Sequence, residues 1–335
     1  MKKTLYILQD GELHRKDNSL YFESAKGRKF IPVENTNDIC IFGNVRMSKR
    51  FLDFSSQKQI IIHYFDMDGK YISTYYPREY YNSGYTIVKQ VEGYLNSDKR
   101  MILAKTIAEG YINQSLKVIN YYINRKACND KTGLEDIQGF IEKTREKIIY
   151  ENTIDGLNLI IKNVEKEYNK SFNFILNNAE FIDNENDNNV EYMRKANLVQ
   201  FGESIGQAII LSEIYKTHLD PRIGYFHDVN SNSFPLCLDI LYIFKPIMVH
   251  RLIFTLINKS IITKKDFENY DGEVFLSRDG KGKFIMEFDK RMRTTVKHRH
   301  LDRYVSYRRL IRLELYKIQK YILEGTKYEP YKALW

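Results

Sequence analysis

Short apolar runs separated by turn residues fill the first 80 residues of the chain. The runs lie at residues 4–8, 19–24, 30–33, 38–43, 59–69 and 70–76. Their length and their β-branched and aromatic content are typical of β-strands, and Asp10-Gly11 and Asp68-Gly69 are good hairpin turns. Residues 46–59 instead space their apolar side chains as a helix does. The pattern predicts a small N-terminal β domain that contains one short helix.

A helical pattern replaces the β pattern after Pro77. Apolar side chains recur at spacings of three and four between Tyr85 and Tyr122. Further helices are predicted at residues 134–150, 153–176, 191–217, 234–258 and 304–324. We therefore predict an α+β protein with a β-rich domain over residues 1–80, a linker over residues 81–90 and a larger all-α domain over residues 91–335.

Composition favours an anionic partner. Lys and Arg outnumber Asp and Glu by 52 to 43, and 14% of the residues are aromatic, so cationic groups and stackable rings are both available to a nucleic acid. The three cysteines lie far apart and form no CxxC pair, which predicts neither a disulfide framework nor a zinc knuckle. No signal peptide or long uncharged apolar segment is evident, so we expect a cytoplasmic protein.

Residues 218–246 contain the densest group of chemically unusual positions. His227 opens a polar loop, and Asp239 follows in a helical apolar pattern where a carboxylate is costly to bury without a partner. An imidazole with a carboxylate suits Mn²⁺ or Mg²⁺. The ordinary alternative is a solvated histidine and a capping aspartate, and spacing by itself does not exclude it.

A third carboxylate candidate lies on the predicted helix over residues 160–176. Glu165 sits beside the apolar stripe of this helix, and Glu167 is a competing choice that spacing does not eliminate.

The region from Lys290 to Arg312 is strongly basic. Arginine binds phosphate through paired donors, and Tyr304 and Tyr307 offer rings on which exposed bases could stack. Our hypothesis is that five residues contact DNA: His298, Arg299, Arg303, Arg308 and Arg312. A solvated helix face is the alternative. A second alternative, binding to RNA, has less support than binding to DNA, because no RNA-binding signature is visible in the sequence.

Three separated blocks resemble one family. The blocks are residues 75–110, the segment SEIYKTHLDPRIGYFHD with the following LDILYIFKPIMVHR, and the segment HLDRYVSYRRLIRLELYKIQKYILEG. They resemble the integrase of CRISPR adaptation, most closely its subtype I-B branch. The resemblance implies a β-rich domain that forms a homodimer and a helical catalytic domain. It also implies a small ferredoxin-like partner protein and the joining of spacer DNA to a CRISPR repeat by transesterification.

The resemblance also assigns the candidate site. By position, Glu165, His227 and Asp239 would be the catalytic residues and the ligands of Mg²⁺ or Mn²⁺. Three residues after Asp239 the family usually has a second acid, and this chain has Tyr242, a neutral phenol at pH 7. Asp228 is the nearest substitute ligand. The resemblance therefore leaves two alternatives, an active integrase or a non-catalytic DNA-binding relative that lost a metal ligand at Tyr242.

Overall fold

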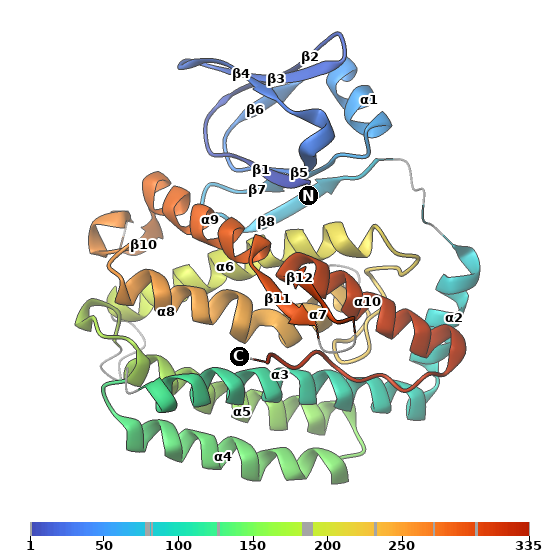
Figure 1. Ribbon diagram of the computed structural model, residues 1–335, viewed down its shortest axis with the longest axis vertical. Coiled ribbons are helices and arrows are strands. Elements are labelled where there is room, and N and C mark those ends of the chain that lie inside the picture. The colour runs from blue at the N-terminus through green and yellow to red at the C-terminus, as the bar shows by residue number, and fades with distance from the viewer. Residues whose placement is uncertain are drawn as a thin grey trace. The chain divides into compact units, whose positions relative to one another are not determined.

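The structure is a computed structural model, and it describes residues 2–77, 81, 83–125, 128–182, 190–230, 233–270, 272–298 and 301–334. Two compact units divide the chain, residues 1–81 and 82–335 (Figure 1). The first unit is rich in strands and the second is mainly helical, which confirms the predicted fold class.

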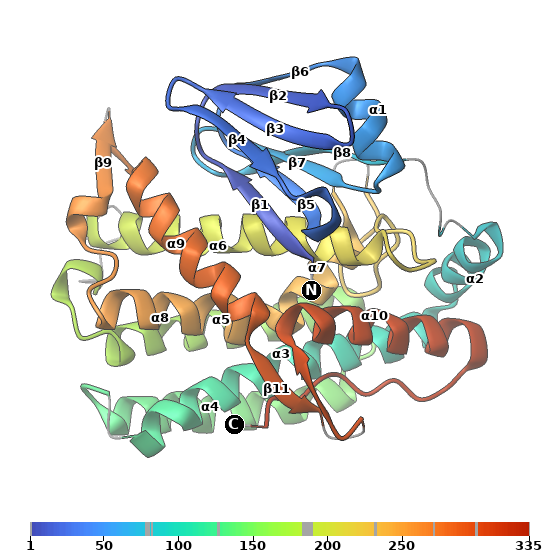
Figure 2. The ribbon, with the colours of Figure 1, turned by 45° about the horizontal axis from the view of Figure 1, so that its top comes forward.

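Two four-stranded sheets and one helix make up the first unit (Figure 2). The strands are β1 (Lys3–Ile7), β2 (Gly11–Lys16), β3 (Ser19–Ser24), β4 (Gly27–Ile31), β5 (Thr36–Ile41), β6 (Val45–Met47), β7 (Ile61–Phe65) and β8 (Tyr71–Tyr75), and the helix is α1 (Lys49–Gln57). One sheet has the order β1-β5-β7-β8 and the other β4-β3-β2-β6. Apolar side chains from both sheets and from α1, among them Leu13, Leu20, Ile39, Phe51 and Ile62, form a common buried core.

Nine helices and two short hairpins are found in the described part of the second unit. The helices are α2 (Gly84–Leu95), α3 (Ser97–Arg125), α4 (Lys131–Tyr150), α5 (Ile154–Ile175), α6 (Val190–Ile214), α7 (Pro235–Lys245), α8 (Arg251–Asn258), α9 (Arg278–Arg293) and α10 (Tyr307–Glu324). The hairpins pair β9 (Phe267–Tyr270) with β10 (Glu273–Leu276), and β11 (Thr295–His298) with β12 (Arg303–Ser306). Helix α2 begins within the range 81–90 that was expected to be a linker.

Helix α7 lies at the centre of the helical unit, in contact with α3 and α6. It continues through a π-helical turn at Pro246–His250 into α8. Two glycines allow α6 to approach the continuous segment of α7, the π-helical turn and α8 closely. A Cβ atom at Gly202 would lie 2.5 Å from Val249, and one at Gly206 would lie 2.7 Å from Met248. Close packing of this kind fixes α7 and every side chain that it presents.

The continuous helical segment that runs from α7 to the end of α8 is long and apolar. The span Pro235–Asn258 has the length and hydropathy of a membrane-crossing helix, although no such span was expected from the sequence. In the folded protein, 83% of its most apolar window is buried. Burial of this extent is what the core helix of a folded domain shows.

Candidate active site

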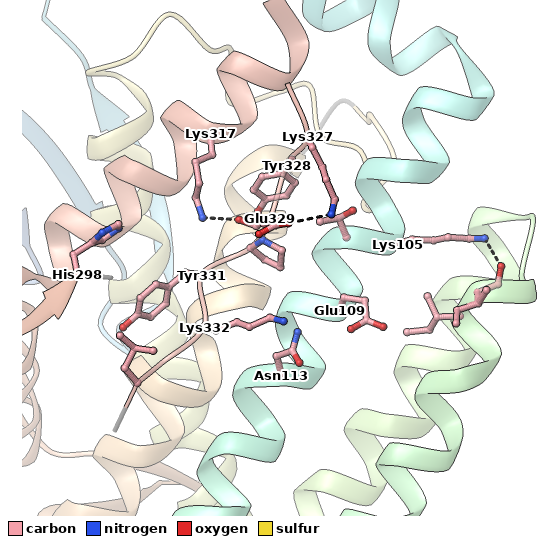
Figure 3. Close-up of a pocket in the computed structure, with 15 residues that line it drawn as sticks. Lys105, Glu109, Asn113, His298, Lys317, Lys327, Tyr328, Glu329, Tyr331 and Lys332 are labelled. Atoms are coloured by element: carbon pink, nitrogen blue, oxygen red, sulfur yellow. Dashed lines mark hydrogen bonds and ion pairs between the residues drawn. The ribbon is translucent and has the colours of Figure 1, made fainter. Parts of the chain in front are cut away.

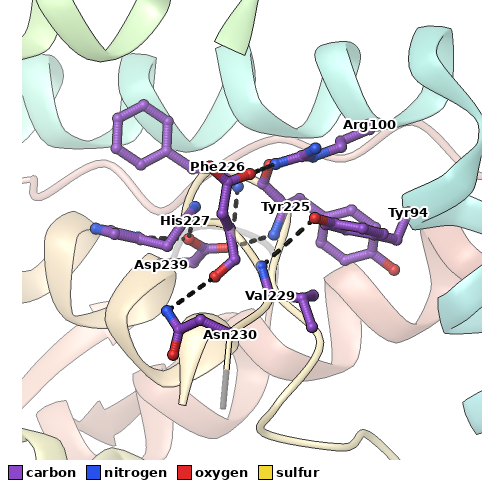
Figure 4. Close-up of polar contacts among 9 residues, drawn as sticks. Tyr94, Arg100, Tyr225, Phe226, His227, Val229, Asn230 and Asp239 are labelled. Carbon is purple, nitrogen blue, oxygen red and sulfur yellow. Dashed lines mark hydrogen bonds and ion pairs between the residues drawn. The ribbon is translucent and has the colours of Figure 1, made fainter. Parts of the chain in front are cut away.

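A single carboxylate organises the loop that carries His227. Asp239 of α7 is fully buried and accepts hydrogen bonds from three successive backbone N–H groups, at 2.6 Å from Tyr225, 3.2 Å from Phe226 and 2.9 Å from His227 (Figure 4). These donors replace the water that the carboxylate loses on burial. The Asp239 carboxylate therefore fixes the backbone of residues 225–227.

The His227 side chain is oriented by the same carboxylate. Its Nδ1 atom lies 2.8 Å from Oδ1 of Asp239 (Figure 4). Since a carboxylate accepts, Nδ1 carries the hydrogen in this pair, and Nε2 is left with a free lone pair. The imidazole is 26% exposed, so Nε2 is available to a metal ion or to a substrate proton.

Two residues far away in the sequence hold this loop from its other side. Gln90 of α2 is fully buried and donates to the carbonyl oxygens of Asp220 (2.9 Å) and Ile223 (2.8 Å). Arg100 of α3 forms an ion pair with Asp228. Both contacts tie the loop to α2 and α3, and neither residue carried any signal in the sequence.

Glu165 on α5 points toward α7 and is bound there by two side chains. The Tyr242 hydroxyl donates to Oε2 of Glu165 at 3.0 Å, and the Lys245 ammonium lies 2.5 Å from Oε1. Lys245 also contacts Glu203 of α6 at 3.2 Å. Asp239, Tyr242 and Lys245 follow one another at intervals of three residues, which places them along one side of α7.

Burial and charge act in opposite directions on Lys245. Burial by itself would lower the pKa of the ammonium, but the carboxylates of Glu203 and Glu165 outweigh it, and the pKa lies above its ordinary value. The pKa of the Tyr242 phenol is raised, first by burial and then by the negative charge of Glu165. Tyr242 is therefore neutral and Lys245 is charged across the physiological pH range.

Tyr242 joins the two parts of the site. Its ring lies edge-on to the His227 ring, with 5.1 Å between centroids, while its hydroxyl holds Glu165. The competing carboxylate, Glu167, instead pairs with Lys170 on its own helix at 2.8 Å. The structure thus brings Glu165 and His227 into contact with one tyrosine.

The donors fit a divalent ion in a specific way. An imidazole nitrogen and a carboxylate suit Mg²⁺ or Mn²⁺, which retain water at their remaining positions, and His227 and Glu165 provide these two groups. Both oxygens of Asp239 are engaged by the His227 ring and by backbone N–H groups, so Asp239 orients His227. Both oxygens of Glu165 are also engaged, by Tyr242 and Lys245, so Glu165 would have to exchange one of these partners to hold an ion. Across the described ranges, no group of three His, Cys, Asp or Glu side chains is arranged around one point.

Two of the basic residues expected to contact DNA are occupied inside the protein. Arg308 is buried, and its Nε lies 2.7 Å from Oε1 of the fully buried Glu213 on α6. The Nε of Arg312 donates to the other oxygen of Glu213 at 2.6 Å. This cluster joins α10 to α6.

Two of the other candidates lie on the strands of the β11–β12 hairpin. Arg303 on β12 is exposed, and His298 ends β11 and is half-buried. Arg299 lies outside the described residues. The hairpin also exposes Tyr304, whose side chain is 70% accessible. Among the described candidates, Arg303 is the one best placed to meet a phosphate.

The chain matches the model of the family described as CRISPR associated protein Cas1 over residues 5–290. It is 46% identical, over the full length of both chains, to the CRISPR-associated endonuclease Cas1 2 of Thermodesulfovibrio yellowstonii. The chain belongs to the Cas1 family.

Solved structures agree with this assignment. The Cas1 protein of Thermotoga maritima superposes with a TM-score of 0.83 at 34% identity, covering 98% of this chain and 99% of that one. A casposase bound to its integration product has a TM-score of 0.84 at 16% identity, covering 98% and 92%, and at that identity it shows a shared fold. The Cas1 fold therefore extends over both units.

Proposed function

We propose that this Cas1-family chain is a metal-dependent DNA endonuclease and integrase that inserts spacer DNA into a CRISPR array. The observation that carries the proposal is the His227–Asp239 pair, whose imidazole ring contacts the same tyrosine that binds Glu165. The endonuclease name of a relative at 46% identity and full coverage supports it.

Each residue of the site has a separate role in this proposal. Glu165 and His227 hold the divalent ion, and Asp239 keeps the His227 ring in one tautomer and orientation. When bound, Mg²⁺ or Mn²⁺ would polarise the scissile phosphate and help to orient the attacking 3′-hydroxyl. Lys245 forms ion pairs with Glu165 of α5 and Glu203 of α6, so its contact with the Oε1 atom of Glu165 must break when an ion binds to that oxygen.

The partners follow from the same family relationship. We propose that DNA lies along the basic hairpin, with contacts from His298, Arg299 and Arg303, while Arg308 and Arg312 support that surface through Glu213 and contact DNA only at its edge. The N-terminal unit would form the homodimer, and a small ferredoxin-like protein would bridge two dimers. The reaction would take place in the cytoplasm.

One observation favours a second candidate function. Tyr242 and Lys245 together engage both oxygens of Glu165, so the carboxylate is satisfied without an ion. A chain whose site is closed in this way could serve as a non-catalytic DNA-binding subunit of the integration complex.

A strand-joining assay separates the two candidates. Labelled prespacer and repeat DNA are incubated with the protein and Mg²⁺ or Mn²⁺, with EDTA as the blank, and DNA binding is measured in parallel by fluorescence anisotropy. We expect ion-dependent joining that His227→Ala abolishes with unchanged DNA binding. His218→Ala, at an exposed histidine nine residues earlier, is the matched control and should join normally.

The opposite results are equally informative. Binding without joining in either ion would support the non-catalytic subunit. Normal joining by the His227→Ala variant would remove the proposed site from the chemistry altogether.

A further inference from the structure

A cavity of about 810 Å³ lies beneath the C-terminal tail of the helical unit (Figure 3), and its lining includes neither His227 nor Glu165. Its walls come from the middle of α3, the end of α4, strand β11, helix α10 and residues 327–334. Small-molecule sites usually have volumes of about 300–1,000 Å³. The cavity is thus large enough for a ligand the size of a nucleotide.

Buried polar side chains anchor the tail that covers the cavity. Gln114 of α3 is fully buried and donates to the carbonyl oxygen of Tyr331 at 2.7 Å. Glu314 of α10 is also buried, and accepts from the Tyr328 hydroxyl at 2.6 Å and from the backbone N–H of Tyr331 at 3.1 Å. The tail is therefore a fixed wall, which is the condition for a preformed site.

The lining of the cavity is cationic. It contains four lysines and two glutamates, a formal excess of two positive charges: Lys105, Lys317, Lys327, Lys332, Glu109 and Glu329. Two contacts from outside the lining offset each other, because Arg145 binds the Glu109 carboxylate at 2.7 Å and Glu314 binds the Lys317 ammonium at 2.6 Å. A cavity with this balance favours an anion.

Two hydrogen-bond donors converge without an acceptor. The side-chain nitrogen of Asn113 is buried and has no hydrogen-bond partner among the residues that the structure describes. Figure 3 shows the Lys332 side chain reaching toward this amide from the tail. A buried donor without a partner costs free energy, and a phosphate oxygen between the two groups would satisfy both.

The remaining wall suits a planar base. Pro330 and Tyr331 line the cavity and are partly exposed, whereas Tyr328 is buried, and aromatic rings accept bases of any sequence by stacking. His298 lines the cavity as well, and it is the last residue of β11 in the basic hairpin. A strand that crosses the hairpin could therefore reach the cavity.

We propose that this cavity binds one nucleotide, with its phosphate at Lys332 and Asn113 and its base against the wall formed by Pro330 and Tyr331. The source can be a free nucleotide or the unpaired end of a DNA strand, and the second source rests on the proposed function because it requires DNA on the hairpin. The site is separate from the His227 and Glu165 site in either case.

The test uses the full chain and three probes: dTMP, a fluorescent five-residue oligodeoxythymidylate and a blunt duplex. Lys332→Glu reverses the free charge, and Asn113→Leu removes the buried donor with little change in shape. Each should weaken binding of the oligonucleotide or of dTMP at least about tenfold, the effect of losing a hydrogen bond to a charged group. Lys320→Glu, at an exposed position of α10 outside the cavity, is the matched control and should bind normally.

The probes identify the ligand and separate this inference from the proposed function. Competition by dTMP would identify a free nucleotide, and tight oligonucleotide binding with no competition by dTMP would identify a strand end. Unchanged binding of both probes by both cavity variants would overturn the inference. Binding of the blunt duplex, which has no unpaired end, reports on the proposed function alone and should not change in the cavity variants.

Discussion

Replacing Lys245 with methionine tests whether this ammonium acts as an internal counter-ion of the site. The side chain is 8% exposed and contacts Glu165 at 2.5 Å and Glu203 at 3.2 Å. Lys245→Met preserves most of the volume and leaves two carboxylates without their cation. Breaking a buried ion pair from one side costs about 3–5 kcal/mol, and the partial exposure of both glutamates places the expected loss near the lower limit, about 3 kcal/mol.

The melting temperature should report this loss directly. For a unit of this size, 1 kcal/mol corresponds to a shift of about 2–4 °C, so we expect the variant to melt about 6–12 °C below the wild type in EDTA. A divalent ion can replace the missing cation. At a concentration of 100 times its Kd it returns about 2.7 kcal/mol, so Mn²⁺ should restore most of the stability of the variant.

The measurement is a thermal melt of both proteins with EDTA and with a series of MnCl₂ concentrations. Lys170→Met is the matched control, because Lys170 pairs with Glu167 on the exposed face of the same helix that carries Glu165. Surface pairs contribute about 0–1 kcal/mol, so this variant should melt close to the wild type. An equal Mn²⁺ response in wild type and Lys245→Met, or an unshifted variant in EDTA, would refute the counter-ion role.

Three further predictions concern the framework of the site and the DNA surface. Asp239→Asn should lower the free energy of unfolding by about 3–5 kcal/mol in a urea titration, because the amide presents a donor to backbone donors, whereas Asp228→Asn at the exposed end of the loop should have a small effect. Burial raises the pKa of the Glu213 carboxyl, but its three cationic neighbours outweigh burial and hold the pKa below its ordinary value of 4.5. The stability that Glu213 contributes is therefore present above pH 4.5 and is lost as the pH falls through the lower pKa of the folded state. Glu213→Gln should remove this part of the acid dependence of stability. Arg303→Glu should weaken duplex binding and reduce the slope of log K against log salt by about 1 with unchanged stability, and a variant with the wild-type slope would exclude a phosphate contact there.

Sequence periodicity predicts the elements whose apolar side chains form a stripe. Helices α4, α5 and α6 begin and end within three residues of the predicted limits. Strand β2 was missed because Leu13 is the one buried residue of its six, and the other five are polar residues or glycine. Helix α9 was missed because charged residues surround its buried stripe of Phe284, Phe288 and Met292.

The site was only partly readable for a different reason. His227 and Asp239 stand out individually, but the role of Asp239 depends on main-chain donors, and a sequence contains no record of where those point. Lys245 resembles a surface lysine until α5 and α6 bring a glutamate to it from each side.

Distance along the chain hid the remaining contacts. The spacing of four between Arg308 and Arg312 predicts a shared helix face, which is correct, but Glu213 lies 95 residues before Arg308 and binds both guanidinium groups. Gln90 and its contacts at Asp220 are separated by 130 residues. Pairings of this kind follow from tertiary packing and have no local pattern.

The way Asp239 holds its loop has a consequence for how the protein tolerates mutation. Every amino acid except proline has a backbone N–H, so substitutions at residues 225–227 leave the three donors in place unless they introduce proline. No substitution in the loop can replace the acceptor if Asp239 is changed. Random mutagenesis should therefore recover folded variants with many different residues in the loop, and almost none with a residue other than aspartate at position 239.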